Sequence, residues 1–270
     1  MKRFTDSEHL RTAQYANSAN LSARIRIHEL YSTEAQPLNE WLFDLMLEHT
    51  PQNARVLEIG TGTGKLWLEN KHRIPAGWEI MLTDFSAGML DDAKHNLEGM
   101  DFTYQVVDIQ DIPFEDDTFD LVLANFMLYH VPDRVKALAE VRRVLKPDGV
   151  FHSATLGKDH MLEINQLIAD MLNDPTWLKD RDTRPFPLET AADELHTAFS
   201  DVQMLPYDCN LQVTDVEPIV DYVNSMIRVD EPLEDHMEAL KQVVRDRIEQ
   251  QGSFFIRKQT GTFISRGGKA

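Results

Sequence analysis

Cysteine is nearly absent from this sequence, which has one, Cys209, in 270 residues. A single thiol excludes an intrachain disulfide framework, argues against a zinc cluster and fits a reducing compartment. No apolar run reaches the length of about 18 residues that a membrane span needs. Residues 1–14 carry a little positive charge but no apolar stretch, so we expect no secretory leader. These absences predict a cytoplasmic protein with no metal site and no membrane association.

Positive charge is also scarce. The 27 lysine and arginine residues face 45 acidic ones, which gives a formal net charge of -18 at pH 7. Such a field repels phosphate backbones and disfavours nucleic acid as a partner. The best basic cluster is too small for a nucleic-acid-binding face, and we interpret it as a solvated strand and tail; it consists of Arg257, Lys258, Arg266 and Lys269. Hydrophobic residues (42%) and charged residues (27%) occur at ordinary globular levels, so a buried core is expected.

Short apolar runs alternate with helical patterns over the first 157 residues. The N-terminal 50 residues are predicted to be helical, with apolar residues at helical spacing between Pro37 and Pro51. Strands are then predicted at 55–60, 79–83, 102–107, 119–124 and 150–155. Helices are predicted from about residue 65, over 86–97 with Ser86 as N-cap, and over 134–145, before a stop signal at 146–149.

The rhythm changes after about residue 157. Helices are predicted at 160–180, 187–200, 216–228 and 232–250, and strands at 201–214 and 253–265. The chain is therefore predicted to form an α/β, Rossmann-like, doubly wound and mostly parallel seven-stranded sheet with helices on both faces. We expect an N-terminal helical cap (1–50), a cofactor-binding core (51–157) and a third part (158–270). This third part would complete the sheet, with helices at 158–182 and 216–250 as a lid over the active site.

A glycine-rich loop, Gly60-Thr61-Gly62-Thr63-Gly64-Lys65, follows the first predicted strand. Glycine at every second position allows a tight turn and close approach of a ligand to the backbone. A phosphate-binding P-loop would need glycine at Ile59 and serine or threonine at Leu66, so that interpretation fails twice. A dinucleotide fingerprint would need its third glycine at Lys65. The remaining interpretation is a loop that holds the amino acid and ribose of S-adenosylmethionine.

Residues 56–64, Val-Leu-Glu-Ile-Gly-Thr-Gly-Thr-Gly, resemble motif I of the class I S-adenosylmethionine-dependent methyltransferases. Residues 118–133 are similar to the stretch around strand four in methyltransferase-11-like and ubiquinone/menaquinone-biosynthesis-like members. Residues 145–150 resemble the turn before strand five. The resemblance covers residues 54–156 well and the rest only in outline. It implies S-adenosylmethionine as the cofactor and methyl transfer as the activity.

The resemblance assigns cofactor-binding roles along the first three strands. The methionine part would contact Gly60, Gly62 and Gly64, with Glu58 orienting its ammonium group or, alternatively, capping the loop. Asp84 follows the second strand and would accept hydrogen bonds from the ribose hydroxyls, or serve as a helix cap. The adenine would lie between Phe85 and Met89, although Met89 also fits a plain core position. Asp108 would accept from the adenine amino group, with Ile109 packed on the ring.

The acceptor side is predicted where the fourth strand ends. Asn125 would lie at the carboxyl edge of the sheet, where open α/β folds bind ligands. Tyr129 and His130 would line the methyl-transfer channel, and His130 is the candidate general base because imidazole titrates near neutral pH. A structural role for His130 stays open. Tyr15 and Arg24 could fold over the cofactor and pair with its carboxylate, or belong to an ordinary amphipathic helix.

Four functions remain in competition at this point. The first is a methyltransferase for a small-molecule acceptor, favoured by the helices after strand five. The second is an RNA or protein methyltransferase, which the net acidity opposes for RNA. The third is a non-catalytic S-adenosylmethionine-binding protein. The fourth, a nicotinamide oxidoreductase, is disfavoured by the misplaced third glycine. Neither the acceptor nor the oligomeric state follows from the sequence.

Overall fold

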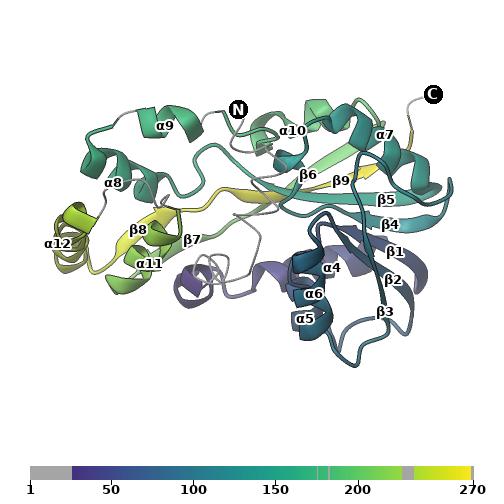
Figure 1. The fold of residues 1–270 in the computed structure, drawn as a ribbon, viewed down its shortest axis with the longest axis horizontal. Coiled ribbons are helices and arrows are strands. Elements are labelled where there is room, and N and C mark those ends of the chain that lie inside the picture. Colours follow the sequence, from purple (N-terminus) through teal and green to yellow (C-terminus); the bar gives the residue numbers. More distant parts are fainter. Residues whose placement is uncertain (1–25, 175, 182, 227–233, 269–270) are drawn as a thin grey trace.

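The structure is a computed structural model that describes residues 26–174, 176–181, 183–226 and 234–268 (Figure 1). Two of the predicted cofactor contacts, Tyr15 and Arg24, lie outside the described residues.

A seven-stranded sheet forms the main body. Its order is β3-β2-β1-β4-β5-β9-β6. The first five strands in this order are parallel, and β9 is antiparallel to both of its neighbours, β5 and β6. The strands span Asn53–Ile59 (β1), Gly77–Asp84 (β2), Phe102–Val106 (β3), Phe119–Leu123 (β4), Leu145–Leu156 (β5), Asp201–Tyr207 (β6) and Thr260–Arg266 (β9). The predicted doubly wound, mostly parallel α/β sheet is confirmed.

Helices cover both faces of this sheet because its central strands are apolar on both sides. On β1, Val56 packs against α4 (Leu38–His49) and α5 (Lys65–Asn70). Its neighbour Leu57 points to the opposite face, which is covered by α7 (Arg134–Val144) and α10 (Leu188–Leu195). This alternation with continuous burial is typical of a parallel sheet between two helical layers. A further helix, α6 (Ala87–Asn96), contacts β2 and β3.

A second lobe lies beyond the carboxyl end of β5 (Figure 1). It contains a two-stranded sheet, β7 (Asn210–Val213) with β8 (Phe254–Arg257), and four helices: α8 (Leu162–Leu172), α9 (Thr176–Arg181), α11 (Glu217–Met226) and α12 (Glu234–Gln251). It has an apolar core of its own, in which Ile164, Leu211, Ile219 and Leu240 are buried together with Ile27 from the short helical segment at 26–31. The helices predicted to form a lid thus build a separate small core beside the main sheet.

Two predicted strands are wrong in the same way. The segments 201–214 and 253–265 are each divided into two strands that belong to different sheets. The antiparallel pair β6–β9 of the main sheet ends at Asp208–Cys209 and Lys258–Gln259. Beyond these residues the same two chain segments pair again as β7–β8. Each half must bury its side chains in a different core, β8 through Phe254 and Ile256 in the lobe, and this requires a break.

The predicted start of the fifth strand is also wrong. The strand begins at Leu145, directly after α7, and not at Val150. Its pairing with β4 jumps from Phe119↔Leu145 to Leu121↔Val150, so the segment 146–149 forms an irregularity within the strand. The proline and glycine in this segment end the helix as predicted, but an irregularity accommodates them inside the strand.

Candidate active site

The glycine loop connects β1 to α5 at the carboxyl edge of the sheet. Gly60, Gly62 and Gly64 have φ angles of +79°, +55° and +74°, a region that other residues rarely adopt. A Cβ atom on Gly60 would lie 2.9 Å from Met127 Cγ, and one on Gly64 would lie 2.5 Å from Leu97 Cδ1. A Cβ on Gly62 would meet no atom within 4 Å. The middle of the loop therefore faces open space, while its two ends are packed against side chains.

Glu58, the last acidic residue before the loop, is almost completely buried and holds the loop in place. Its Oε2 atom accepts hydrogen bonds from Thr61 Oγ1 (2.7 Å) and from Trp67 Nε1 (2.6 Å). Burial raises the pKa of the Glu58 carboxyl group, and these two hydrogen bonds oppose the rise. The loop-holding role considered in the sequence is thus present, and Oε1 retains acceptor capacity.

Asp84 ends β2 and joins it to the loop. Its Oδ2 atom accepts the Gly62 N–H (3.0 Å), and its Oδ1 atom accepts the Ser86 N–H (2.8 Å). The predicted N-cap of the following helix is confirmed as Ser86, whose hydroxyl accepts the Met89 N–H. Burial raises the pKa of Asp84, while the backbone hydrogen bonds favour its charged form. A carboxylate has about four acceptor positions, so Asp84 can accept further hydrogen bonds beside the open loop.

The predicted adenine contacts differ in exposure. Phe85 is 43% exposed directly after Asp84, whereas Met89 is 3% exposed on the inner side of α6. Asp108 lies beyond β3, and its carboxylate accepts the backbone N–H and side-chain amide of Gln110. Ile109 is buried in the core on the α7 side. Phe85 therefore presents an exposed apolar surface to a ligand. Met89 and Ile109 are packed in the core, so only a small part of their surface is accessible to one.

The chain after β4 turns sharply toward the glycine loop. Asn125 Oδ1 accepts the Ala154 N–H of β5 (3.1 Å), and Phe126, in a left-handed conformation at φ +56°, donates its N–H to Ala154 O (2.8 Å). This turn places Met127 against Gly60. A 3₁₀ turn follows at Leu128–His130, in which the rings of Tyr129 and His130 lie 4.5 Å apart, edge to face. A non-glycine residue at positive φ costs on the order of 1 kcal/mol, and such strain concentrates at functional sites.

The helical segment 26–31 falls within the predicted N-terminal helical region and lies beside the loop. Lys65, the first residue of α5, forms an ion pair with Glu29. The preceding His28 has a largely buried ring whose Nδ1 atom has no hydrogen-bond partner. Burial, with the charges of Lys258 and Lys65, lowers the pKa of His28 to about 3, so its imidazole is neutral. No sequence pattern indicated this position, because it depends on contacts between distant segments.

These groups fit a nucleoside amino acid better than a phosphate ligand. The loop presents open backbone at Gly62, a carboxylate with spare acceptor positions at Asp84 and an exposed aromatic ring at Phe85. A carboxylate at this place would accept hydroxyl hydrogens and repel a phosphate. Within the described ranges, no group of three or more histidine, cysteine or acidic residues is placed to hold a metal ion. No helix in that same part of the chain is long and apolar enough to cross a membrane.

Comparison with known proteins identifies the central part of the chain. Residues 57–153 match a protein family described as a Methyltransferase domain. The ubiquinone/menaquinone biosynthesis C-methyltransferase UbiE of Geotalea daltonii is 39% identical over 101 residues, 36% of this chain and 43% of the relative. The malonyl-[acyl-carrier protein] O-methyltransferase of Geobacter sulfurreducens is 31% identical over 138 residues, 51% of each chain. The aligned regions thus span about half or less of these curated relatives.

Solved structures extend the likeness of the fold over most of the chain. Phosphoethanolamine N-methyltransferase 2 of Haemonchus contortus, in complex with S-adenosyl-L-methionine, has a TM-score of 0.59 at 19% identity and covers 97% of this chain and 60% of its own. A methyltransferase structure from Anabaena variabilis has a TM-score of 0.62 at 14% identity, covering 83% of this chain and 96% of its own. At this identity the likeness establishes the fold alone.

Proposed function

Because residues 57–153 form a class I S-adenosylmethionine-dependent methyltransferase domain, we propose that the whole chain is an enzyme that methylates a small-molecule acceptor. The observation that carries the proposal is the hydrogen bond from the Gly62 N–H to the Asp84 carboxylate, beside the open space that Gly62 faces. One carboxylate fixes the loop and still offers acceptor positions to a sugar beside it. A plain strand-to-helix turn needs no such group.

The loop and its supports bind and orient the cofactor. The backbone of Gly60, Gly62 and Gly64 contacts the amino acid part of the cofactor. Glu58 holds the loop in place through its hydrogen bonds with Thr61 and Trp67, and its carboxylate favours an ammonium group nearby. Asp84 binds the ribose hydroxyls, and Phe85 covers one side of the base. Met89, Asp108 and Ile109 complete the base site. When bound, S-adenosylmethionine supplies a methyl group on a positively charged sulfur, a leaving group that needs no further activation.

The segment after β4 positions the acceptor. Asn125 is fixed to β5 by its hydrogen bond to Ala154, so the chain that follows it has one defined path. Tyr129 and His130 form an aromatic wall there. His130 takes the proton from an acceptor atom that must lose one, and aligning that atom and excluding water supply most of the rate enhancement. The cofactor contacts predicted for Tyr15 and Arg24, which lie outside the described residues, remain part of this proposal.

A small-molecule acceptor fits the architecture and the charge. The second lobe lies beyond the carboxyl edge of the sheet, where it can enclose a compact ligand (Figure 1). The formal charge of -18 opposes a nucleic-acid substrate. The names of the relatives refer to ubiquinone/menaquinone biosynthesis, malonyl-[acyl-carrier protein] and phosphoethanolamine. The three names differ, so the acceptor does not follow from the shared domain.

Two measurements test the proposal. Titration calorimetry with S-adenosylmethionine, S-adenosylhomocysteine and NAD should show binding of the first two only; binding of NAD alone would overturn the cofactor assignment. Turnover is then measured with a methyl-labelled donor against a metabolite extract, total RNA and a protein extract. Label in the low-molecular-weight fraction supports the proposal. Label confined to RNA or protein contradicts the acceptor class, and cofactor binding without any transfer would indicate a non-catalytic protein.

A further inference from the structure

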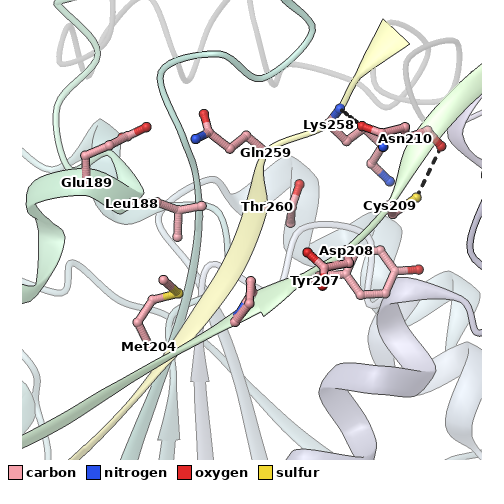
Figure 2. Close-up of a pocket in the computed structure, with 11 residues that line it drawn as sticks. Leu188, Glu189, Met204, Tyr207, Asp208, Cys209, Asn210, Lys258, Gln259 and Thr260 are labelled. Atoms are coloured by element: carbon pink, nitrogen blue, oxygen red, sulfur yellow. Dashed lines mark hydrogen bonds between the residues drawn. The ribbon is translucent and has the colours of Figure 1, made fainter. Parts of the chain in front are cut away.

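A pocket of about 360 Å³ lies where the β6–β9 pair leaves the main sheet and continues as β7–β8 (Figure 2). Its walls come from both halves of the chain. Leu188 of α10 and Met204 and Pro206 of β6 provide apolar surface, while Tyr207, Lys258 and Thr260 provide polar groups. Figure 2 shows Thr260 at the start of β9 between Leu188 and Tyr207, and Lys258 two residues earlier, in the connection from β8 and beside Asn210. The break in the two strands, which no sequence pattern indicated, is what opens this space.

Lys258 is the unusual member of the lining. The sequence placed it in a solvated basic cluster, but its side chain is largely buried, and burial lowers the pKa of its amino group. Its Nζ atom lies 5.5 Å from the centre of the Tyr207 ring, and it forms no ion pair with any described residue. Its neighbour Arg257, in contrast, is exposed and pairs with Asp159. Its amino group is hydrogen-bonded to the Cys209 side chain, but no carboxylate of a described residue neutralises it, although buried charges in proteins are normally paired with an opposite charge.

Two further polar atoms nearby lack partners. Thr260 is 4% exposed, and its Oγ1 atom forms no hydrogen bond. The Nδ1 atom of His28 is also buried without a partner, and Lys258 is one of the two charges that lower the pKa of this imidazole. Leaving a buried donor or acceptor unpaired costs about 1–3 kcal/mol per group. Within the pocket lining, the unpaired Thr260 hydroxyl and the Lys258 ammonium, which has no carboxylate partner among the described residues, point to a ligand that pairs with them.

The pocket lies within reach of the active site. Thr260 pairs with Leu156 near the end of β5, and Asn125 bonds Ala154, two residues earlier on the same strand. The order β4-β5-β9 separates the two places by two strand spacings, about 10 Å. A molecule with six to eight atoms in a chain, or one ring with a short arm, covers that distance.

We infer that this pocket binds the acidic end of the methyl acceptor, a carboxylate or phosphate on an apolar chain or ring, and that Lys258 is the residue that recognises it. The inference rests on the proposed function and deepens it. The Lys258 ammonium pairs with the acid, the Thr260 hydroxyl donates to it, and Leu188 and Met204 contact the apolar part. The methylated atom then lies at the opposite end, near Asn125 and His130. Glu189 and Asp208 also line the pocket, and their carboxylates would select against acids that are not aligned with Lys258.

The test uses the full chain saturated with S-adenosylhomocysteine and three six-carbon probes: hexanoate, hexyl phosphate and the neutral hexanamide. Ligand-observed NMR measures their dissociation constants for the unaltered protein and for Lys258→Met, Lys258→Arg and Lys241→Met. Lys241 is the matched control, because it pairs with Glu238 on α12, outside the pocket. We expect one of the two anions to bind at least tenfold more tightly than hexanamide. The anion that binds more tightly identifies a carboxylate or a phosphate acceptor.

The variants separate a specific site from general charge effects. Lys258→Met should abolish the preference for the acid, Lys258→Arg should keep most of it, and Lys241→Met should leave it unchanged. Equal binding of hexanoate, hexyl phosphate and hexanamide, or an unchanged preference in Lys258→Met, would overturn the inference. Calorimetry with S-adenosylhomocysteine on each variant shows whether the fold and cofactor site are intact. Failure of the unaltered protein to bind that cofactor would instead count against the proposed function.

Discussion

Replacing Asp84 by asparagine tests the hydrogen bonds that connect the end of the second strand to the glycine loop. The carboxylate accepts two backbone N–H groups, and asparagine keeps one acceptor oxygen while turning an NH₂ group toward the other donor. A hydrogen bond to a charged group contributes about 1.5–3 kcal/mol, so Asp84→Asn should lower the free energy of unfolding by about 2 kcal/mol. The ribose also loses a charged acceptor. A loss of roughly 3 kcal/mol there corresponds to about 10²-fold weaker cofactor binding.

Two assays separate these effects. Urea unfolding of the cofactor-free protein measures the loop contribution, and titration calorimetry with S-adenosylhomocysteine measures the ribose contribution. Asp91→Asn is the control, because Asp91 is exposed on α6 and pairs only with Lys94. It should change stability by less than about 0.5 kcal/mol and leave affinity unchanged. If Asp84→Asn destabilises the protein but binds the cofactor within threefold of the unaltered chain, Asp84 is a structural residue and the ribose assignment is refuted.

Three further predictions concern the loop, the candidate base and a buried histidine. Gly62→Ala should cost about 1–2 kcal/mol in urea unfolding because its φ is +55°, and at least tenfold in cofactor affinity because the methyl group enters the open space; unchanged calorimetry would contradict this. His130→Gln should slow turnover about 10²-fold with cofactor affinity retained, whereas lost affinity would make His130 a scaffold residue. Burial lowers the pKa of His152 to about 3, with His49 and Arg266 adding positive charge. Only the unfolded chain then takes up this proton as the pH falls from 6.5 toward 3, so His152 should contribute a loss of about 2 kcal/mol of stability between pH 7 and pH 5. His28, with a similarly lowered pKa, adds a loss of its own, so His152→Phe should reduce the slope without abolishing it, and an equal slope in both proteins would refute the assignment.

The features predicted correctly from the sequence are those determined by neighbouring residues. Alternating apolar runs and helices specify the parallel sheet, three glycines in six residues specify the loop, and Ser86 caps its helix through a contact three residues away. In each case the relevant interaction lies within a few residues or repeats with a regular period. The positions of Glu58 and Asp84 follow from the same logic, since each stands at the carboxyl end of a strand that the pattern reveals.

Features that depend on distant contacts could not be predicted. The segment 253–265 has one strand pattern, but its two halves pack in different cores, and only the partner segments reveal the break. Met127 contacts Gly60 across 67 positions of sequence because Phe126 adopts a left-handed conformation, for which phenylalanine carries no signal. Lys258 lies among other basic residues in the sequence and is distinguished from them by burial alone.

The residues that we assign to cofactor binding lie inside the family match, and the pocket that we assign to the acceptor lies outside it. Residues 57–153 contain the glycine loop, Glu58 and Asp84, to which we assign the binding of groups that every S-adenosylmethionine molecule carries. The pocket around Lys258 lies outside that range, in strands that connect the main sheet to the second lobe. Two relatives of this region are named ubiquinone/menaquinone biosynthesis C-methyltransferase and malonyl-[acyl-carrier protein] O-methyltransferase, so their names give different reactions. We therefore propose that residues outside this range select the acceptor together with Asn125, Tyr129 and His130 inside it. Lys258 and His28 both come from segments beyond the match: Lys258 lines the pocket at the junction of the two lobes, and the Nδ1 atom of His28 is buried without a partner.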